Sequence, residues 1–270
     1  MRVALFAWML LGVLQLPAQQ ITSANPRVSS ILQGMKSPNW AQRSEAFGKA
    51  TNLSSAPGIN HWDADRLRLG IFELLIKEST GGLKEPENET AENYGEGYGE
   101  DKSQYYSGLI SFVAGLNDER AIPALLSAAG TGEMATGAVA GFGRKALDAT
   151  LAQVKSEDSD KAIGALFVIQ EMLKMRTVGD TDSHLRIKNA LRSALASPEY
   201  EVRENAMWPI EFLDDREEFV PLLQAIAEHD PYKSPYAVGN GENGEENQYE
   251  VRHHARLLLL KIANHEPPGS

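Results

Sequence analysis

The sequence predicts an all-α protein, an α-solenoid (superhelix) of about six helix pairs with two long loop insertions. Three observations predict it. A short motif repeats along the chain, and apolar residues recur at helical spacing after each strong copy. In addition, no run of alternating polar and apolar residues is long enough for a strand. Of the 270 residues, 42% are hydrophobic, so the chain can supply a core.

The repeated motif is an aromatic residue, two further residues, Arg, two residues and Ala. It stands at 200–206 and 249–255, with a weaker copy at 40–46 and a degenerate one at 156–165. After each strong copy, apolar residues follow at i, i+4, i+8 and i+11, which places them on one stripe of a helix. These residues are Val202, Ala206, Ile210 and Leu213 in one copy, and Val251, Ala255, Leu259 and Ile262 in the other.

Six helix pairs follow from this spacing and from the turns between the apolar runs. Pro123 and Pro221 each follow an acidic turn, and both fit the first turn of a helix, where the missing amide costs no bond. The expected N-caps are Asp158, Asp182 or Ser183, and Ser197. The predicted pairs are 27–36 with 39–53, 63–79 with 101–116, 119–129 with 132–143, 144–155 with 159–174, 183–196 with 199–214, and 216–229 with 248–264.

Helix pairs with Pro in the first helix and Val-Arg-x-x-Ala in the second resemble HEAT repeats. Here the unit is about 25–35 residues, shorter than the usual 40–47, and is similar to the compact HEAT-like repeats first described in phycobilisome lyases. The resemblance is strongest at 197–264 and 117–129. It implies an α-solenoid that binds other proteins. It does not imply lyase activity, because function depends on a site rather than on a scaffold.

The first 18 residues have the order of a secretory signal peptide. Arg2 gives a basic start, an apolar run covers 3–16, and Ala18 offers a small residue for cleavage. The apolar run is shorter than the roughly 20 residues that span a bilayer. We therefore expect an exported protein, periplasmic or secreted, with no membrane span after signal cleavage. Its repeat domain would occupy 19–264, followed by a C-terminal tail at 265–270.

Composition and motifs exclude several classes of function. The chain has no cysteine, which excludes disulfides and cysteine-ligated metals, and its net charge of -11 argues against a nucleic-acid partner. It has no HExxH, GxSxG or P-loop motif, so we expect no catalytic residues and no enzyme activity. The glycine-rich stretch 130–143 lacks a following Lys-Ser/Thr and is interpreted as small residues in a tightly packed helix pair.

Two insertions, 80–101 and 231–248, interrupt helix pairs between their first and second helices, so both should emerge on one edge of the solenoid. Seven of the eight tyrosines lie in or just after them, and Tyr200 should lie near the same edge. Tyrosine supplies a large, rigid contact area in binding loops. The alternative is that these rings pack the loops onto the scaffold. The candidate partner-binding residues are Tyr94, Tyr98, Tyr105, Tyr106, Tyr200, Tyr232, Tyr236 and Tyr249.

The arginines of the repeat, Arg43, Arg203 and Arg252, are expected to pair with carboxylates or turn carbonyls near the start of a neighbouring helix and so to set the register between repeats. A ligand-binding arginine ladder is the alternative. No cofactor is expected, with calcium as the open alternative. The stretch 240–247 is rich in the oxygen ligands that calcium prefers. Its candidate ligands are Glu242, Asn243, Glu245 and Glu246.

These observations together predict an exported, non-enzymatic HEAT-repeat scaffold. It would bind a protein partner through its loop-bearing edge or through the concave face formed by the second helices. The alternatives are a calcium-stabilised structural or binding protein of the cell envelope and a HEAT-like, lyase-related enzyme.

Overall fold

The computed structural model describes residues 25–81, 98–234 and 248–267. These residues form helices joined by short turns, with no strand among them, which confirms the all-α prediction. None of the described helices has the length and hydropathy needed to cross a membrane. The predicted signal peptide, most of both insertions and the last three residues lie outside the described part of the chain.

The helices closely follow the predicted pairs. Two of the first helices open with a 3₁₀ turn before the α-helix begins. In chain order the elements are α1 (Pro26–Gly34), α2 (Trp40–Ser54), α3 (His61–Ser79), α5 (Tyr98–Gly115), η1 (Glu119–Ala121), α6 (Ile122–Ala128), η2 (Ala129–Thr131), α7 (Glu133–Gly141), α8 (Arg144–Gln153), α9 (Ser159–Lys174), α10 (Thr181–Leu195), α11 (Tyr200–Asn205), α12 (Met207–Ile210), η3 (Arg216–Phe219), α13 (Val220–His229) and α14 (Glu250–Ala263).

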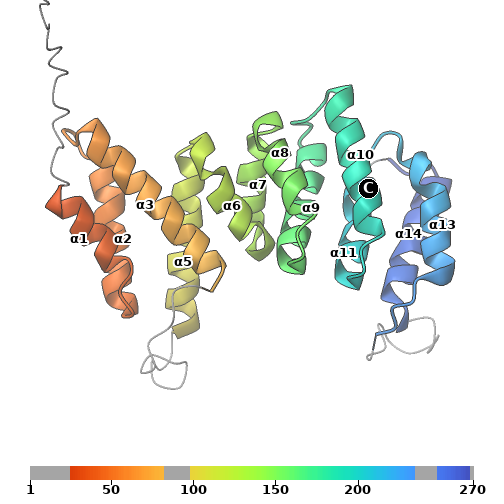
Figure 1. Cartoon of the computed structure of the whole chain (residues 1–270), viewed down its shortest axis with the longest axis horizontal. Coiled ribbons are helices and arrows are strands. Elements are labelled where there is room, and N and C mark those ends of the chain that lie inside the picture. The colour runs from red at the N-terminus through yellow and green to blue at the C-terminus, as the bar shows by residue number, and fades with distance from the viewer. Residues whose placement is uncertain (1–24, 82–97, 235–247, 268–270) are drawn as a thin grey trace, which may run out of the picture.

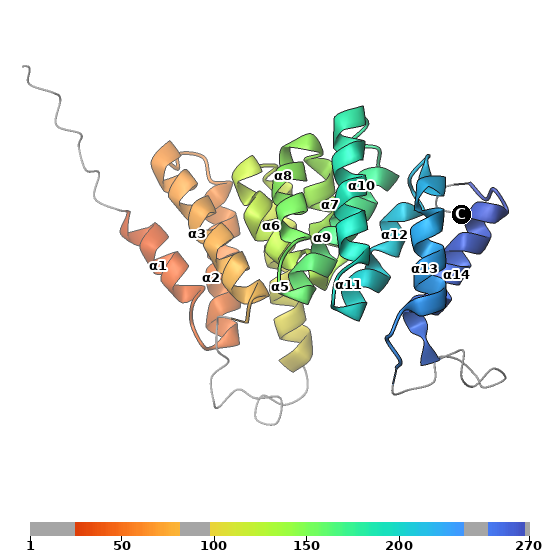
Figure 2. The ribbon, with the colours of Figure 1, turned by 45° about the vertical axis from the view of Figure 1, so that its right-hand side comes forward.

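The helices lie side by side in a row that follows the chain, with α1 at one end and the α13–α14 pair at the other (Figures 1 and 2). Most packing is between elements close in sequence, such as α1 with α2, α6 with α7, α7 with α9, and α13 with α14. The buried apolar residues extend along the whole row, from Val28 to Ile262. Each pair therefore buries its apolar stripe against its neighbours.

One predicted helix, 199–214, is broken into α11 and α12. Pro209 lies within the broken stretch, and proline has no amide to bond the carbonyl four residues earlier, that of Asn205. Asn205 is the last residue of α11. The Val-Arg motif thus occupies a short helix whose end is determined by this proline.

The predicted N-caps are partly right. Asp158 caps α9, because its side chain accepts a hydrogen bond from a backbone amide in the first turn. The cap of α10 is wrong, since the helix begins earlier, and Asp180 takes that role by accepting from both the amide and the hydroxyl of Ser183. The Ser197 cap is also wrong. Its hydroxyl accepts from the Glu199 amide at 3.2 Å, but Ser197 lies three residues before α11 begins.

Two glycines of the glycine-rich stretch pack closely, but against α9 and the turn after it rather than within the predicted pair of 119–129 with 132–143. Gly130 lies against Gly164 of α9, where a Cβ added to Gly164 would come within 2.8 Å of the Gly130 backbone nitrogen. Gly143 has a φ of +54°, and a Cβ there would lie 2.7 Å from the carbonyl oxygen of Thr177. Both positions need the absence of a side chain because backbone approaches backbone.

Candidate protein-binding edge

The helix ends that flank the two insertions lie along one edge of the row. The end of α3 and the start of α5 flank the first insertion, and the end of α13 and the start of α14 flank the second. All four ends lie toward the lower edge of the molecule in Figures 1 and 2. The shared edge expected from the sequence is thus present in the described helices.

A buried aspartate organises this edge at the root of the second insertion. Asp230, the residue after α13, is 5% exposed. Its carboxylate accepts two hydrogen bonds from Arg203 of α11, with Nε at 2.7 Å and Nη2 at 3.0 Å. Such a two-pronged pair fixes direction as well as distance. Arg203 Nη1 also donates to the carbonyl oxygens of Ser197 and Pro198, each at 2.8 Å.

Asp230 also contacts α14 and the base of the insertion. Its backbone oxygen accepts from Nε of Arg252 on α14 at 2.7 Å, and its carboxylate accepts from the Tyr232 amide at 3.0 Å. The amide of Ser234 donates to the Gln248 carbonyl at 2.7 Å, which joins the two sides of the insertion. One residue therefore ties α11, α13, α14 and the base of the insertion together.

Arg43 has an equivalent environment at the first insertion. It is 1% exposed, and its Nε donates to the carbonyl of Ser37, six residues back, just as Nη1 of Arg203 donates to the carbonyl of Ser197. Its Nη1 donates to Glu78 at 3.0 Å. The expected partner types are present, but the predicted place is wrong, because Glu78 and Asp230 lie at helix ends rather than starts. The C-terminal end of a helix dipole is negative and favours a cation there.

Two of the candidate tyrosines form a stacked pair beside Asp230. We call Arg203, Asp230 and the three tyrosines around them, Tyr200, Tyr232 and Tyr249, the Asp230 platform. The rings of Tyr200 and Tyr232 are parallel within 3°, with centroids 3.4 Å apart. Both rings are half-buried and pack against the core on one side. The nearby Tyr232 hydroxyl, burial and the Glu201 carboxylate all raise the pKa of the Tyr200 phenol. The pair is a rigid aromatic surface beside the insertion.

Tyr249 completes the described part of the platform. It is half-buried and precedes α14. The Arg252 guanidinium lies 4.1 Å from its ring centroid, and the Lys233 ammonium lies 5.9 Å from it. Both cations lie over the ring, where the aromatic quadrupole attracts them. Lys233 and Asp230 were missed by the sequence analysis, although their position beside a predicted insertion was a usable signal.

Two other candidate tyrosines contact the scaffold, and one of them is buried in the core. Tyr105 is 4% exposed and lies edge-on to Trp40 and Phe47 in the core, so its assignment as a partner-binding residue is wrong. Burial raises the pKa of its phenol. The Tyr106 hydroxyl lies 2.9 Å from Ser79 Oγ and 3.1 Å from Thr131 Oγ1. Tyr106 thus bridges elements of the scaffold, as the packing alternative proposed for these rings.

The side chains of the remaining candidates are not described. Tyr94 and Tyr236 fall in the insertions, and Tyr98 begins α5 without a described side chain. The proposed calcium ligands Glu242, Asn243, Glu245 and Glu246 also fall there. Among the described residues, no three His, Asp or Glu side chains gather as a metal site would require.

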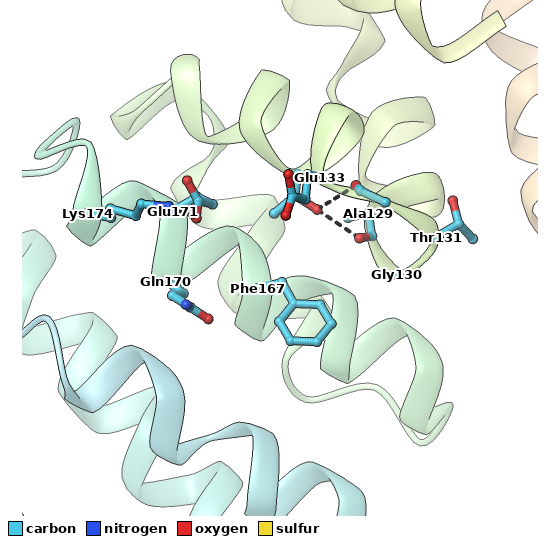
Figure 3. Close-up of a pocket in the computed structure, with 10 residues that line it drawn as sticks. Ala129, Gly130, Thr131, Glu133, Phe167, Gln170, Glu171 and Lys174 are labelled. Atoms are coloured by element: carbon cyan, nitrogen blue, oxygen red, sulfur yellow. Dashed lines mark hydrogen bonds and ion pairs between the residues drawn. The ribbon is translucent and has the colours of Figure 1, made fainter. Parts of the chain in front are cut away.

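A groove lies between the second helices of two neighbouring pairs, the helices that the sequence named as an alternative binding face. It has a volume of about 640 Å³ and lies between the η2–α7 turn and α9. Figure 3 shows Phe167, Gln170 and Lys174 along α9, with Thr131 and Glu133 on the other wall. Thr136 at its base donates to the Ala129 carbonyl at 2.8 Å, and Lys174 pairs with Glu171 at 3.1 Å.

A histidine–glutamate pair links the last two second helices. His254 Nδ1 of α14 lies 2.7 Å from Glu204 Oε1 of α11. The ring centroids of His254 and Trp208 are 5.5 Å apart. The contact with the Glu204 carboxylate raises the pKa of His254, partial burial opposes this, and Glu250 adds to the increase. The charged form of His254 is therefore favoured in the folded state.

This pair should make stability depend on pH. Because the folded pKa is raised, its contribution is complete below the unfolded pKa of about 6.5 and is lost as pH rises through the folded value. We expect Glu204→Gln to cost roughly 1 kcal/mol more at about pH 6 than at about pH 9, as measured by urea unfolding. His253→Gln, on the exposed neighbour, should keep the wild-type profile. Parallel profiles for wild type and Glu204→Gln would contradict the assignment.

Comparison with known proteins gives no match, neither to a protein-family model nor to a curated protein. The class of protein must therefore be inferred from the fold and from the geometry of the edge.

Proposed function

We propose that this protein is an exported, non-enzymatic scaffold that binds a protein partner through its loop-bearing edge. In this proposal the row of helix pairs is a HEAT-like α-solenoid, and the repeated arginines hold its repeats in register. The observation that carries the proposal is the Tyr200–Tyr232 stack. The stack lies beside Asp230, which joins α11, α13 and α14.

The geometry supports binding because this platform is rigid before any partner arrives. Aromatic side chains that are already ordered lose little conformational entropy on association, so more of their contact energy appears as affinity. The Arg252 and Lys233 cations beside Tyr249 add polar contacts at the margin of the aromatic surface. Binding residues are often carried on loops that a rigid scaffold holds in place, and this insertion has such a base.

The groove between α7 and α9 supports the second candidate surface, the concave face of the second helices. Its walls carry a half-buried aromatic ring and charges of both signs, which suit an extended peptide segment. The groove lies on helices of the third and fourth pairs, whereas the Asp230 platform lies on the last two pairs. The two surfaces can therefore be separated by mutation.

The test is crosslinking in the native envelope followed by identification of the partner and measurement of its affinity for the purified protein. We expect Tyr200→Ala with Tyr232→Ala to weaken that affinity by at least about 30-fold, since central aromatic residues dominate interface energies. Replacing 84–100 and 233–246 with short Gly-Ser turns should abolish capture while changing stability by about 1 kcal/mol or less.

Phe167→Ala is the matched control, because it removes a half-buried ring from the other surface. If Phe167→Ala abolishes capture and the tyrosine variant binds normally, the concave face is the binding surface. If the loop-replaced protein unfolds, the rings were packing the scaffold, and the edge proposal fails.

A further inference from the structure

Helix α3 has an apolar stripe on its outer side. Trp62, Leu69 and Ile76 are 74%, 40% and 37% exposed, and they recur every seven residues along one face. The opposite face is buried through Leu67, Ile71, Leu74 and Leu75. In Figures 1 and 2 none of the other described helices lies over the outer side of α3. Exposed apolar residues that fall singly need no explanation, but a regular stripe marks an interaction surface.

Two charges alternate with the apolar residues of this stripe. Arg66 lies between Trp62 and Leu69, and Glu73 lies between Leu69 and Ile76; both are exposed. Neither makes an ion pair with any described residue, whereas Asp65, one position along, pairs with Arg120 at 2.7 Å. The stripe thus presents one free cation and one free anion, placed on either side of Leu69.

This order makes the stripe complementary to itself. Under a two-fold axis at Leu69, two α3 helices run antiparallel, and Leu69 meets its copy. Trp62 then lies opposite Ile76 of the other chain, seven residues away on each side. Arg66 of each chain comes within reach of Glu73 of the other chain, so that two charge pairs form. A two-fold interface requires this property, because the same patch must fit both subunits.

We propose that α3 is a homodimer interface, occupied by the α3 helix of a second copy of this chain in antiparallel orientation. The groove beside the stripe supports this occupant. It has a volume of about 540 Å³ and is bordered by Leu32 of α1, which extends the apolar surface next to Leu69. Gly70 lies next to Leu32, where an added Cβ would come within 2.6 Å of the Leu32 side chain. Without a side chain at position 70, the surface beside Leu69 leaves room for a second helix.

The charge pattern favours a second copy over an unrelated helix. Two charge pairs form in this arrangement, and both would be lost in a parallel one, where Arg66 would face Arg66. The contact is one helix wide, so we expect a dissociation constant in the micromolar range. It lies at the other end of the row from the Asp230 platform and does not depend on the proposed function.

The first test is the mass of the full-length protein in solution, measured by analytical ultracentrifugation over a range of concentrations. Wild type should pass from monomer to dimer, and Leu69→Glu should raise the dissociation constant at least about 30-fold, since two central leucines are lost. Leu185→Glu, on α10 and 51% exposed, is the matched control and should dimerise as wild type. Circular dichroism checks that each variant is folded. A monomeric wild type, or a Leu69→Glu protein that dimerises normally, would overturn the proposal.

A charge exchange tests the orientation. Arg66→Glu and Glu73→Arg should each weaken the dimer, because each variant places like charges opposite one another twice. The double variant Arg66→Glu with Glu73→Arg should restore it, and an equimolar mixture of the two single variants should form a heterodimer. High salt should reduce these differences, since the pairs are exposed. If the mixture associates no better than either single variant, the antiparallel register is wrong.

Discussion

Replacing Asp230 with alanine is expected to lower the free energy of unfolding by about 3–5 kcal/mol. The carboxylate is 2% exposed and lies against the Arg203 guanidinium, which is 9% exposed. Removing the acid leaves a cation in a site with little access to water, and a buried unpaired charge costs far more than a lost surface pair. The amide of Tyr232 loses its acceptor as well.

Urea or thermal unfolding measures this change, with Asp214→Ala as the control. Asp214 is exposed, and we expect its replacement to change stability by about 0.5 kcal/mol or less. A double variant, Arg203→Met with Asp230→Leu, should be less destabilised than Asp230→Ala, because it removes both buried charges and keeps apolar volume. A cost for Asp230→Ala as small as that of Asp214→Ala would show that water reaches Arg203 and that the platform is not rigid.

Replacing Gly164 with valine is expected to destabilise the protein by about 2 kcal/mol. A Cβ at this position would lie 2.8 Å from the Gly130 nitrogen and 3.3 Å from its Cα, closer than side-chain carbons approach backbone. Backbone cannot rotate away as a flexible side chain can, so α9 must move away from η2. That displacement would disturb the middle of the row, where α9 contacts η2, α7 and α11.

Gly137→Ala is the matched control for Gly164, since it places a methyl group in the interior of a helix with nothing within 4 Å. It should raise stability by about 0.5–1 kcal/mol, because alanine favours the helix and restricts the unfolded chain. Both variants are measured by the same unfolding transition. If Gly164→Val proves as stable as Gly137→Ala, the contact between Gly130 and Gly164 is not as close as the fold indicates.

The sequence by itself determined the fold class and nearly all of the helices. Helix spacing and local signals are encoded within a few residues, so the Pro123 and Pro221 starts and the Asp158 cap were readable without tertiary information. The same locality explains the errors at α10 and α11. Asp180 and Ser183 both suit a cap, and only the position of the first helical turn decides between them.

Side-chain environments depended on which helices meet in space, and only the tertiary structure decided them. Tyr105 and Tyr200 both lie near an insertion, yet one is buried against Trp40 and the other is stacked on Tyr232 at the edge. The motif marked Arg203, but its partner Asp230 lies 27 residues away, at the end of another helix. Burial and pairing arise from contacts between distant segments, and local sequence does not encode which segments those are.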